Sequence, residues 1–152
     1  VLSTLHTNDA PSTINRLMNM GIEPFLVATS VNLIVAQRLI RRICQKCKQP
    51  DDVPVQALLN IGFTEAEAPN LQLFKGRGCE VCNQRGYKGR VGLYEVMTVT
   101  EDIRELILSG ASAVELRRKA LEEGMIGLRQ SGLQKIRDGV TTIEEVVRET
   151  VL

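Results

Sequence analysis

The feature that most limits how this chain can fold is the placement of its four cysteines. They form two pairs, Cys44-Gln-Lys-Cys47 and Cys79-Glu-Val-Cys82, with 31 residues between the pairs. The two thiolates of a C-x2-C pair can face one ion, and two such pairs complete a tetrahedral shell with no position left for a catalytic water. The spacing therefore predicts a structural zinc site.

Other cysteine chemistry remains open at the level of sequence. Two disulfides, a redox-active pair or an iron–sulfur cluster could use the same four residues, and the 31-residue insert is longer than in common zinc ribbons. No secretory leader is visible, so we expect reduced thiols rather than disulfides. Zinc is the favoured interpretation.

Basic side chains crowd both cysteine pairs. They are Arg38, Arg41, Arg42, Lys46 and Lys48 on one side, and Lys75, Arg77, Arg85, Lys88 and Arg90 on the other. One interpretation is a nucleic-acid-binding ribbon. The other is that these cations offset the net charge of 2− that four thiolates and a divalent ion would carry. Three Phe, two Tyr and no Trp offer few surfaces on which bases could stack, so we favour the second and expect no nucleic-acid partner.

The first third of the chain is predicted to hold a strand and two helices. Residues 1–6 are apolar enough for a strand, Asp9 can cap a helix over 10–20, and a longer helix is expected over 24–43. Residues 25–40 form the most apolar stretch. It is shorter than the about 20 residues that a membrane span needs, so we expect a buried helix.

Regular patterns become scarce after residue 43. Proline and glycine interrupt residues 44–90, where only "PVQALLNIG" indicates a short helix. Residues 89–99 alternate as a strand does, with Val91, Leu93 and Glu95 on one side.

Capping residues predict that the remainder is helical. Thr100, Ser112 and Thr142 each begin a helix, and the last two are followed three residues later by glutamate. Three glycines are placed as helix ends: Gly110, Gly124 and Gly139.

His6 is the only histidine in the chain. It lies between a predicted strand and a predicted helix start, where ligands gather in α/β sheets. It could polarise a phosphate or a water, or it could be a structural residue at a strand end. The 152 residues contain no phosphate loop of the G-x-x-x-x-G-K-[ST] type and no Ser/His/Asp pattern, so the residues alone leave both roles open.

Three long stretches resemble the secretion ATPases, the assembly motors of type II secretion and type IV pili. The stretch "STLHTNDAPSTINRLMNMGIEPFLVATSVNLIVAQRLIRRIC" is similar to the segment that follows the Walker B strand in that family. The stretches "CEVCNQRGYKGRVGLYEVMTV" and "GMIGLRQSGLQKIRDGVTTIEEVVRET" are similar to the rest of its C-terminal region. The resemblance runs from Val1 to Leu152.

The resemblance implies an α/β fold in three parts. Residues 1–43 would be the tail of a RecA-like P-loop ATPase core, 44–90 a tetracysteine zinc-binding segment, and 91–152 a mainly helical C-terminal subdomain. "TLHTNDA" matches the family's His box, so a catalytic role near the γ-phosphate carries over to His6. The family's zinc motif carries over to Cys44, Cys47, Cys79 and Cys82.

The resemblance also implies cofactors, partners and location. Such motors use ATP and Mg²⁺, are typically hexameric and cytoplasmic, and attach to an inner-membrane platform protein. The family's Walker A loop, Asp box, Walker B strand and arginine fingers lie upstream of the residues that match Val1. We therefore expect this chain to be a fragment that opens on an internal strand and does not hydrolyse ATP alone. Retraction motors usually lack the tetracysteine segment, which favours assembly or secretion.

Two alternatives from other functional classes stay open. One is a zinc-ribbon domain that binds nucleic acid through its basic flanks. The other is a scaffold or adaptor that keeps the fold without the motor activity.

Overall fold

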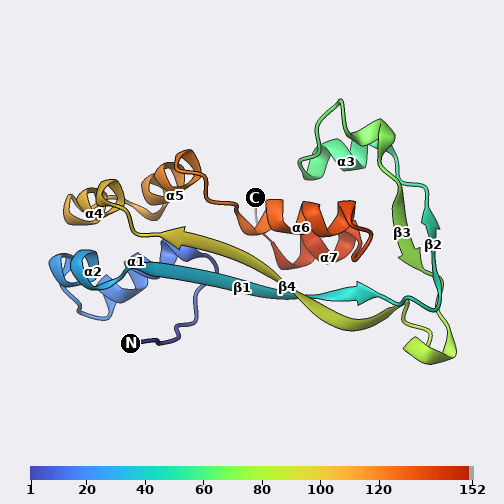
Figure 1. The fold of residues 1–152 in the computed structure, drawn as a ribbon, viewed down its shortest axis with the longest axis horizontal. Helices are drawn as coiled ribbons and strands as arrows, with labels where there is room; N and C mark the ends of the chain where they lie inside the picture. Colours follow the sequence, from blue (N-terminus) through green and yellow to red (C-terminus); the bar gives the residue numbers. More distant parts are fainter. Residues whose placement is uncertain (151–152) are drawn as a thin grey trace. The chain divides into compact units, whose positions relative to one another are not determined.

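A computed structural model describes residues 1–150 of the chain and shows a mixture of helices and strands (Figure 1). The elements are α1 (Ala10–Asn19), α2 (Pro24–Ser30), β1 (Leu33–Ile43), β2 (Lys48–Asp51), α3 (Val55–Ile61), η1 (Ala68–Asn70), β3 (Leu73–Gly76), η2 (Glu80–Cys82), β4 (Tyr87–Thr98), α4 (Glu101–Leu108), α5 (Ala113–Glu122), α6 (Leu128–Arg137) and α7 (Ile143–Glu149). Strands β1 and β4 pair in one two-stranded sheet, and β2 and β3 pair in another.

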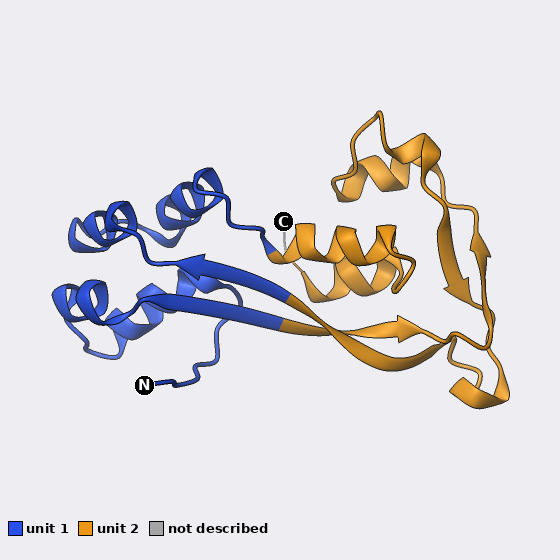
Figure 2. Cartoon of the chain, viewed as in Figure 1, with its two compact units in different colours: residues 1–37, 94–127 blue, residues 38–93, 128–152 orange. Residues whose placement is uncertain are grey.

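The chain divides into two compact units (Figure 2). Unit 1 comprises Val1–Gln37 and Tyr94–Gly127, and unit 2 comprises Arg38–Leu93 and Leu128–Leu152. Each unit is built from segments far apart in sequence, and both β1 and β4 pass from one unit to the other. Helices α4 and α5 belong to unit 1, whereas α6 and α7 belong to unit 2. The three functional parts expected from the sequence stay a prediction.

The long helix expected over residues 24–43 is wrong. The helix ends at Ser30, and Leu33–Ile43 is strand β1. The buried residues of β1 are Ala36, Ile40 and Ile43, which are spaced four and three apart as on a helix face. Exposed and covered residues do alternate from Leu33 to Ile40, as in a strand. The fully buried positions alone mislead, because Arg38 is only partly covered and the alternation ends at Arg41.

The strand expected at residues 1–6 is also absent. Residues 1–7 adopt no regular secondary structure, and neither two-stranded sheet includes them. A strand exists only where a neighbouring strand pairs with its backbone groups, and the part of the chain that the structure describes places none beside this segment.

Most other helices and β4 follow the sequence predictions, whereas strands β2 and β3, in the interrupted stretch after residue 43, were not predicted. Asp9 caps α1 by accepting a hydrogen bond from the Ser12 N–H at 2.8 Å. Thr100, Ser112 and Thr142 cap α4, α5 and α7 in the same way. The predicted alternation of β4 is confirmed, with Leu93, Glu95 and Met97 buried. Among residues 1–150, none of the helices combines the length and apolar character that crossing a bilayer requires.

Each unit has its own apolar interior. In unit 1, helices α1, α2, α4 and α5 pack against one another and bury Ile14, Val27, Ile103, Ile107 and Leu116. In unit 2, α3, α6 and α7 surround a cluster that includes Leu58, Phe63, Leu73, Leu133 and Val146. The antiparallel pair of β2 and β3, with Lys48 opposite Gly76, leads from this cluster toward the cysteines.

Candidate functional site

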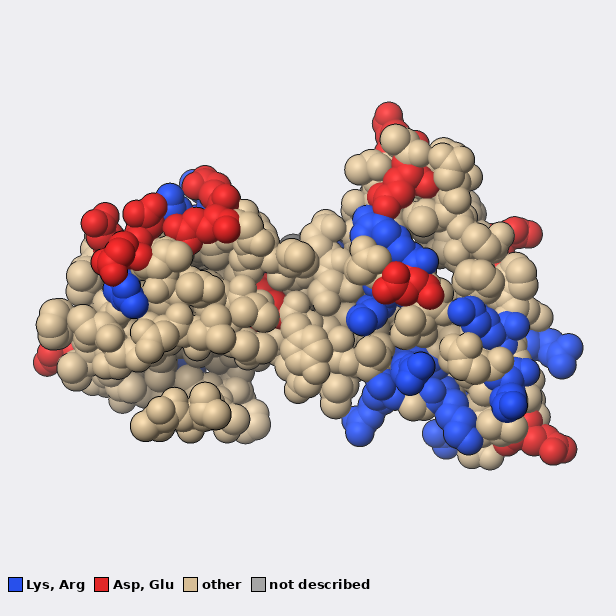
Figure 3. All heavy atoms as spheres, in the orientation of Figure 1, with Lys and Arg blue, Asp and Glu red and all other residues tan. Residues whose placement is uncertain are grey.

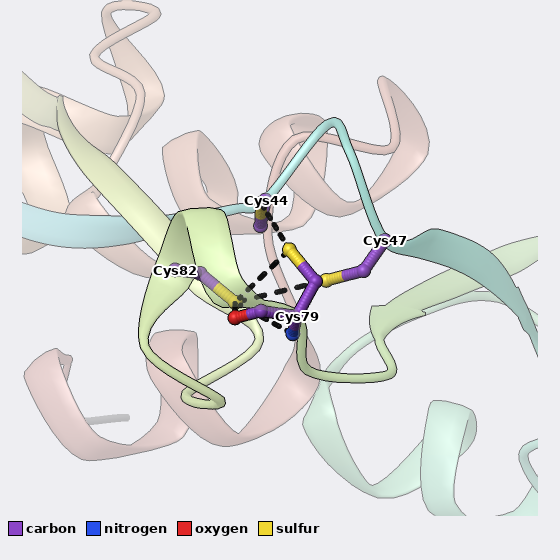
Figure 4. Close-up of side chains that lie close together, drawn as sticks. All are labelled: Cys44, Cys47, Cys79 and Cys82. Atoms are coloured by element: carbon purple, nitrogen blue, oxygen red, sulfur yellow. Dashed lines mark hydrogen bonds between the residues drawn. The ribbon is translucent and has the colours of Figure 1, made fainter.

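The fold brings all four cysteines to one point in unit 2 (Figure 4). Cys44 follows the last residue of β1, and Cys47 immediately precedes β2. Cys79 is the N-cap of η2, and Cys82 is the last residue of that turn. Their sulfur atoms all lie within 4.8 Å of one another, and the described residues bring together no other group of this kind.

The spacing of the sulfur atoms fits a single tetrahedral ion. The Sγ atoms are 3.9 Å apart between Cys44 and Cys79, 3.8 Å between Cys47 and Cys82, and 3.7 Å between Cys79 and Cys82. Four ligands at the usual Zn–S distance of about 2.3 Å would lie about 3.8 Å apart. A disulfide needs about 2.05 Å, and all four cysteines are free thiols. The shell is also too small to place several iron and sulfide atoms between the thiolates.

Backbone N–H groups point at two of the sulfur atoms. Gly78 donates to Cys47 Sγ, and both Cys79 and Gly86 donate to Cys82 Sγ, each at 3.3 Å. Burial alone would raise the pKa of the Cys82 thiol, but hydrogen bonds from these N–H groups and from the thiols of Cys79 and Cys47 together outweigh burial and lower the pKa to about 6. Burial raises the pKa of Cys47 to about 11 despite the Gly78 bond. The site therefore stabilises negative charge on sulfur first at Cys82.

Two glycines that the sequence analysis did not single out hold the cysteine pairs together. A Cβ atom on Gly76 would lie 2.0 Å from the carbonyl oxygen of Gly86, so the two backbones touch. That same oxygen accepts a hydrogen bond from the Cys44 N–H at 2.9 Å, and the Arg77 N–H donates to the Cys47 carbonyl at 3.0 Å. The available signal was the glycine spacing around the second pair, in "KGRGCEVCNQRG".

Unit 2 carries 14 Lys and Arg against nine Asp and Glu, whereas unit 1 carries five against nine. Figure 3 shows Lys and Arg gathered in one region of the visible face and Asp and Glu gathered in another. Several of the cations near the cysteines have partners within the chain. Lys75 pairs with Asp51 at 3.2 Å, Lys48 lies over the Phe74 ring, and Lys88 donates to the Val81 carbonyl. These contacts agree with an electrostatic role inside the unit.

His6 is exposed and lies in the irregular segment before α1 in unit 1. It does not belong to the cysteine group. The residue after it is tied to the helix, because the Thr7 and Thr13 hydroxyls lie 2.8 Å apart. The catalytic role of His6 remains a prediction, whereas the contact of its neighbour Thr7 with α1 is a feature of the structure.

Comparison with known proteins gives a consistent answer along the whole chain. The family model described as "Type II/IV secretion system protein" matches residues 1–148. The type IV pilus assembly ATPase PilB of Myxococcus xanthus is 54% identical over 151 residues, which cover 99% of this chain and 27% of that protein. PilB of Pseudomonas aeruginosa is 47% identical over 150 residues, or 99% of this chain and 26% of the relative.

Type II secretion proteins match nearly as well. Type II secretion system protein E of Pseudomonas aeruginosa is 43% identical over 150 residues, covering 99% of this chain and 29% of the relative. The chain thus spans between a quarter and a third of the length of these relatives. From the match over residues 1–148, the chain belongs to the type II/IV secretion system protein family.

Proposed function

We propose that this chain is the C-terminal portion of a hexameric ATPase motor that powers type II protein secretion or type IV pilus assembly. The observation that carries the proposal is the similarity to pilus assembly ATPases and type II secretion protein E over nearly all of its residues. Residues 1–43 would then complete a RecA-like core whose phosphate loop and Walker B strand come from the longer protein. The motor would lie in the cytoplasm, peripheral to the inner membrane.

In this proposal the four cysteines hold a structural Zn²⁺. Their spacing and the N–H groups aimed at Cys47 and Cys82 fit a closed shell of four thiolates. The ion would keep residues 44–90 as a rigid arm that contacts a neighbouring subunit or the inner-membrane platform protein.

His6 is proposed to lie at the γ-phosphate of ATP in the intact motor. ATP with Mg²⁺ would supply the transferable phosphoryl group, and positioning dominates catalysis of that transfer. An exposed imidazole held by an anchored neighbouring residue can orient the attacking water.

The motor proposal is tested with His6→Ala in the intact protein, by comparing ATP binding with single-turnover hydrolysis. We expect binding to persist and hydrolysis to fall by about 100-fold or more, as for loss of a general acid–base or water-positioning group. Ser3→Ala, in the same exposed segment, is the control. Unchanged hydrolysis would make His6 structural, and an unmutated protein that binds no ATP would favour the scaffold alternative.

The zinc proposal is tested by metal analysis of the purified protein and of Cys82→Ser. We expect one zinc per chain and its loss in the variant, with Val81→Ala as a control that lies in the same turn and removes no ligand. A chain that carries no metal, or iron in its place, would contradict it.

The positive charge of unit 2 justifies one test of the nucleic-acid alternative. A nucleic-acid binder would lose affinity for DNA or RNA steeply as salt rises, because the association is driven by release of counterions from the phosphates. We expect no such salt-dependent binding. Tight binding that weakens with salt would replace the motor proposal for this region.

A further inference from the structure

A buried carboxylate in unit 1 contacts the first turn of α1, which begins four residues after His6. Glu95 lies on β4 and has no exposed surface. Its Oε1 atom accepts a hydrogen bond from the Ala10 N–H at 2.9 Å, across 85 residues of sequence. Ala10 is the first residue of α1 and lies four positions after His6.

Arg117 of α5 holds this carboxylate from the other side. Its guanidinium donates to Oε1 at 3.1 Å and to Oε2 at 3.3 Å. The same guanidinium lies 3.5 Å from a carboxylate oxygen of Asp9, the N-cap of α1. One ion-pair network therefore joins the start of α1, the middle of β4 and α5.

The network leaves the first turn of α1 little freedom. The first N–H groups of a helix have no partner inside the helix and need one elsewhere. Ala10 donates to Glu95, Pro11 has no N–H, and Ser12 donates to Asp9. The backbone at the first three helical positions is thus fully satisfied, and two of the contacts run through the Glu95–Arg117–Asp9 network.

The segment that carries His6 continues directly from this turn. Thr7 lies between His6 and the helix, and its hydroxyl lies 2.8 Å from that of Thr13, which also donates to the Asp9 carbonyl. The direction in which His6 leaves α1 therefore depends on where Glu95 and Arg117 hold the helix start.

We propose that Glu95 and Arg117 are positioning residues for His6. They fix the first turn of α1 so that the imidazole reaches the reacting phosphate in a productive orientation. The proposal rests on the proposed function, because it requires His6 to act on bound ATP. Buried ion pairs add little net stability compared with apolar side chains, so a positional role accounts better for a charge in this interior.

The structure supplies a matched control in unit 2. Glu145 is equally buried, accepts a hydrogen bond from a backbone N–H at 2.8 Å, and is paired with the Arg41 guanidinium. It has the same chemistry as Glu95 and lies in the unit that does not contain His6. Any general cost of neutralising a buried, arginine-paired carboxylate should therefore appear in both Glu95→Gln and Glu145→Gln.

The experiment is single-turnover ATP hydrolysis and ATP binding by the intact motor, for Glu95→Gln, Glu145→Gln and His6→Ala. We expect Glu95→Gln to lower the rate at saturating ATP by about 10- to 100-fold, as a misplacement of about 1 Å can. We expect its ATP affinity to stay within about threefold and Glu145→Gln to keep the unmutated rate. Equal rates for Glu95→Gln and the unmutated motor would overturn the proposal.

The double variant His6→Ala/Glu95→Gln separates this inference from the proposed function. If Glu95 acts through His6, the double variant hydrolyses ATP as fast as His6→Ala alone. If the rate loss of the double variant equals the product of the two single losses, the positioning role is overturned, but the role of His6 itself stands. An unaffected His6→Ala would remove the proposed role of His6 and this inference with it, and an unmutated protein that binds no ATP would remove the proposed motor function. Arg117→Lys, at a side chain that is one-third exposed, keeps the charge but loses the two-pronged contact, and it decides the question if Glu95→Gln does not fold.

Discussion

The interior of unit 1 and the cysteine end of unit 2 join distant segments by different means. In unit 1, four helices bury large aliphatic side chains, and a carboxylate–arginine pair formed by Glu95 and Arg117 lies beside them. At the cysteine end, the buried cluster consists of Cys44, Cys47 and Cys82, with Cys79 packed against it. Few apolar atoms are available there to leave water, so hydrophobic burial contributes little.

This difference teaches where each region gets its stability. Burial of apolar surface acts in any buffer, whereas four thiols hold a loop together only while an ion binds them. The stability of the cysteine end should therefore depend mainly on bound metal and on the close packing of its backbone. The stability of unit 1 should not change when metal is removed.

The largest effect is expected for Gly76→Ala. The new methyl group would lie 2.0 Å from the Gly86 carbonyl oxygen, so the two backbones must separate and the cysteine pairs with them. Overpacking costs about 1–3 kcal/mol, and we expect the upper end because the clash is with backbone. Zinc affinity and the urea midpoint measure the effect. Gly21→Ala is the control, because its φ of +91° costs only about 1–2 kcal/mol and nothing lies within 4 Å. Equal losses of zinc affinity and of urea midpoint in Gly76→Ala and Gly21→Ala would contradict the close packing of Gly76 on Gly86.

Acid should weaken a different part of unit 2. Burial would raise the pKa of Glu145, but hydrogen bonds and the charge of Arg41 outweigh it and hold the pKa below its ordinary value. A lowered folded-state pKa stabilises the protein above the unfolded value of about 4.3, and that stabilisation is lost as the pH falls through the folded pKa. Urea unfolding between about pH 5 and pH 2 should therefore be less pH-dependent in Glu145→Gln. If the free energy of unfolding depends on pH equally in Glu145→Gln and in the unmutated protein, Glu145 makes no such contribution.

The smallest effects are expected at two helix caps, one in each unit. Ser112→Ala removes one capping bond from α5 and should cost about 1 kcal/mol. Thr142→Ala removes the cap of α7 and also the contact of 2.7 Å with the Tyr87 hydroxyl, so we expect about 2 kcal/mol. Denaturant midpoints of the two variants provide the comparison. A larger loss of stability in Ser112→Ala than in Thr142→Ala would show that the Tyr87 contact does not stabilise the protein.

Local signals predicted the local features of the fold. Asp9, Thr100, Ser112 and Thr142 were recognisable as caps because each satisfies a backbone N–H within its own first turn. The alternation around Leu93 predicted β4 because that strand buries one side.

Features that depend on distant partners escaped prediction. Strand β1 was taken for a helix because its long apolar run is also typical of a buried helix, whereas pairing with the distant β4 determines its conformation. Spacing alone suggested that the cysteines would converge, but nothing in the sequence indicates that Gly76 touches Gly86. Likewise, Glu95 was predicted on the same side of its strand as Leu93, but nothing in the sequence indicates its contact with Ala10, which joins residues 85 positions apart.

The most direct test of this account is backbone hydrogen exchange of the intact protein with and without a zinc chelator. We predict that chelation removes protection from residues 44–51 and 76–90 and leaves α1, α4 and α5 of unit 1 protected. The loss should be large, since structural zinc binds with about 10 kcal/mol or more. Unchanged protection around the cysteines, or equal loss in both units, would contradict the claim that a bound ion holds this end of the molecule.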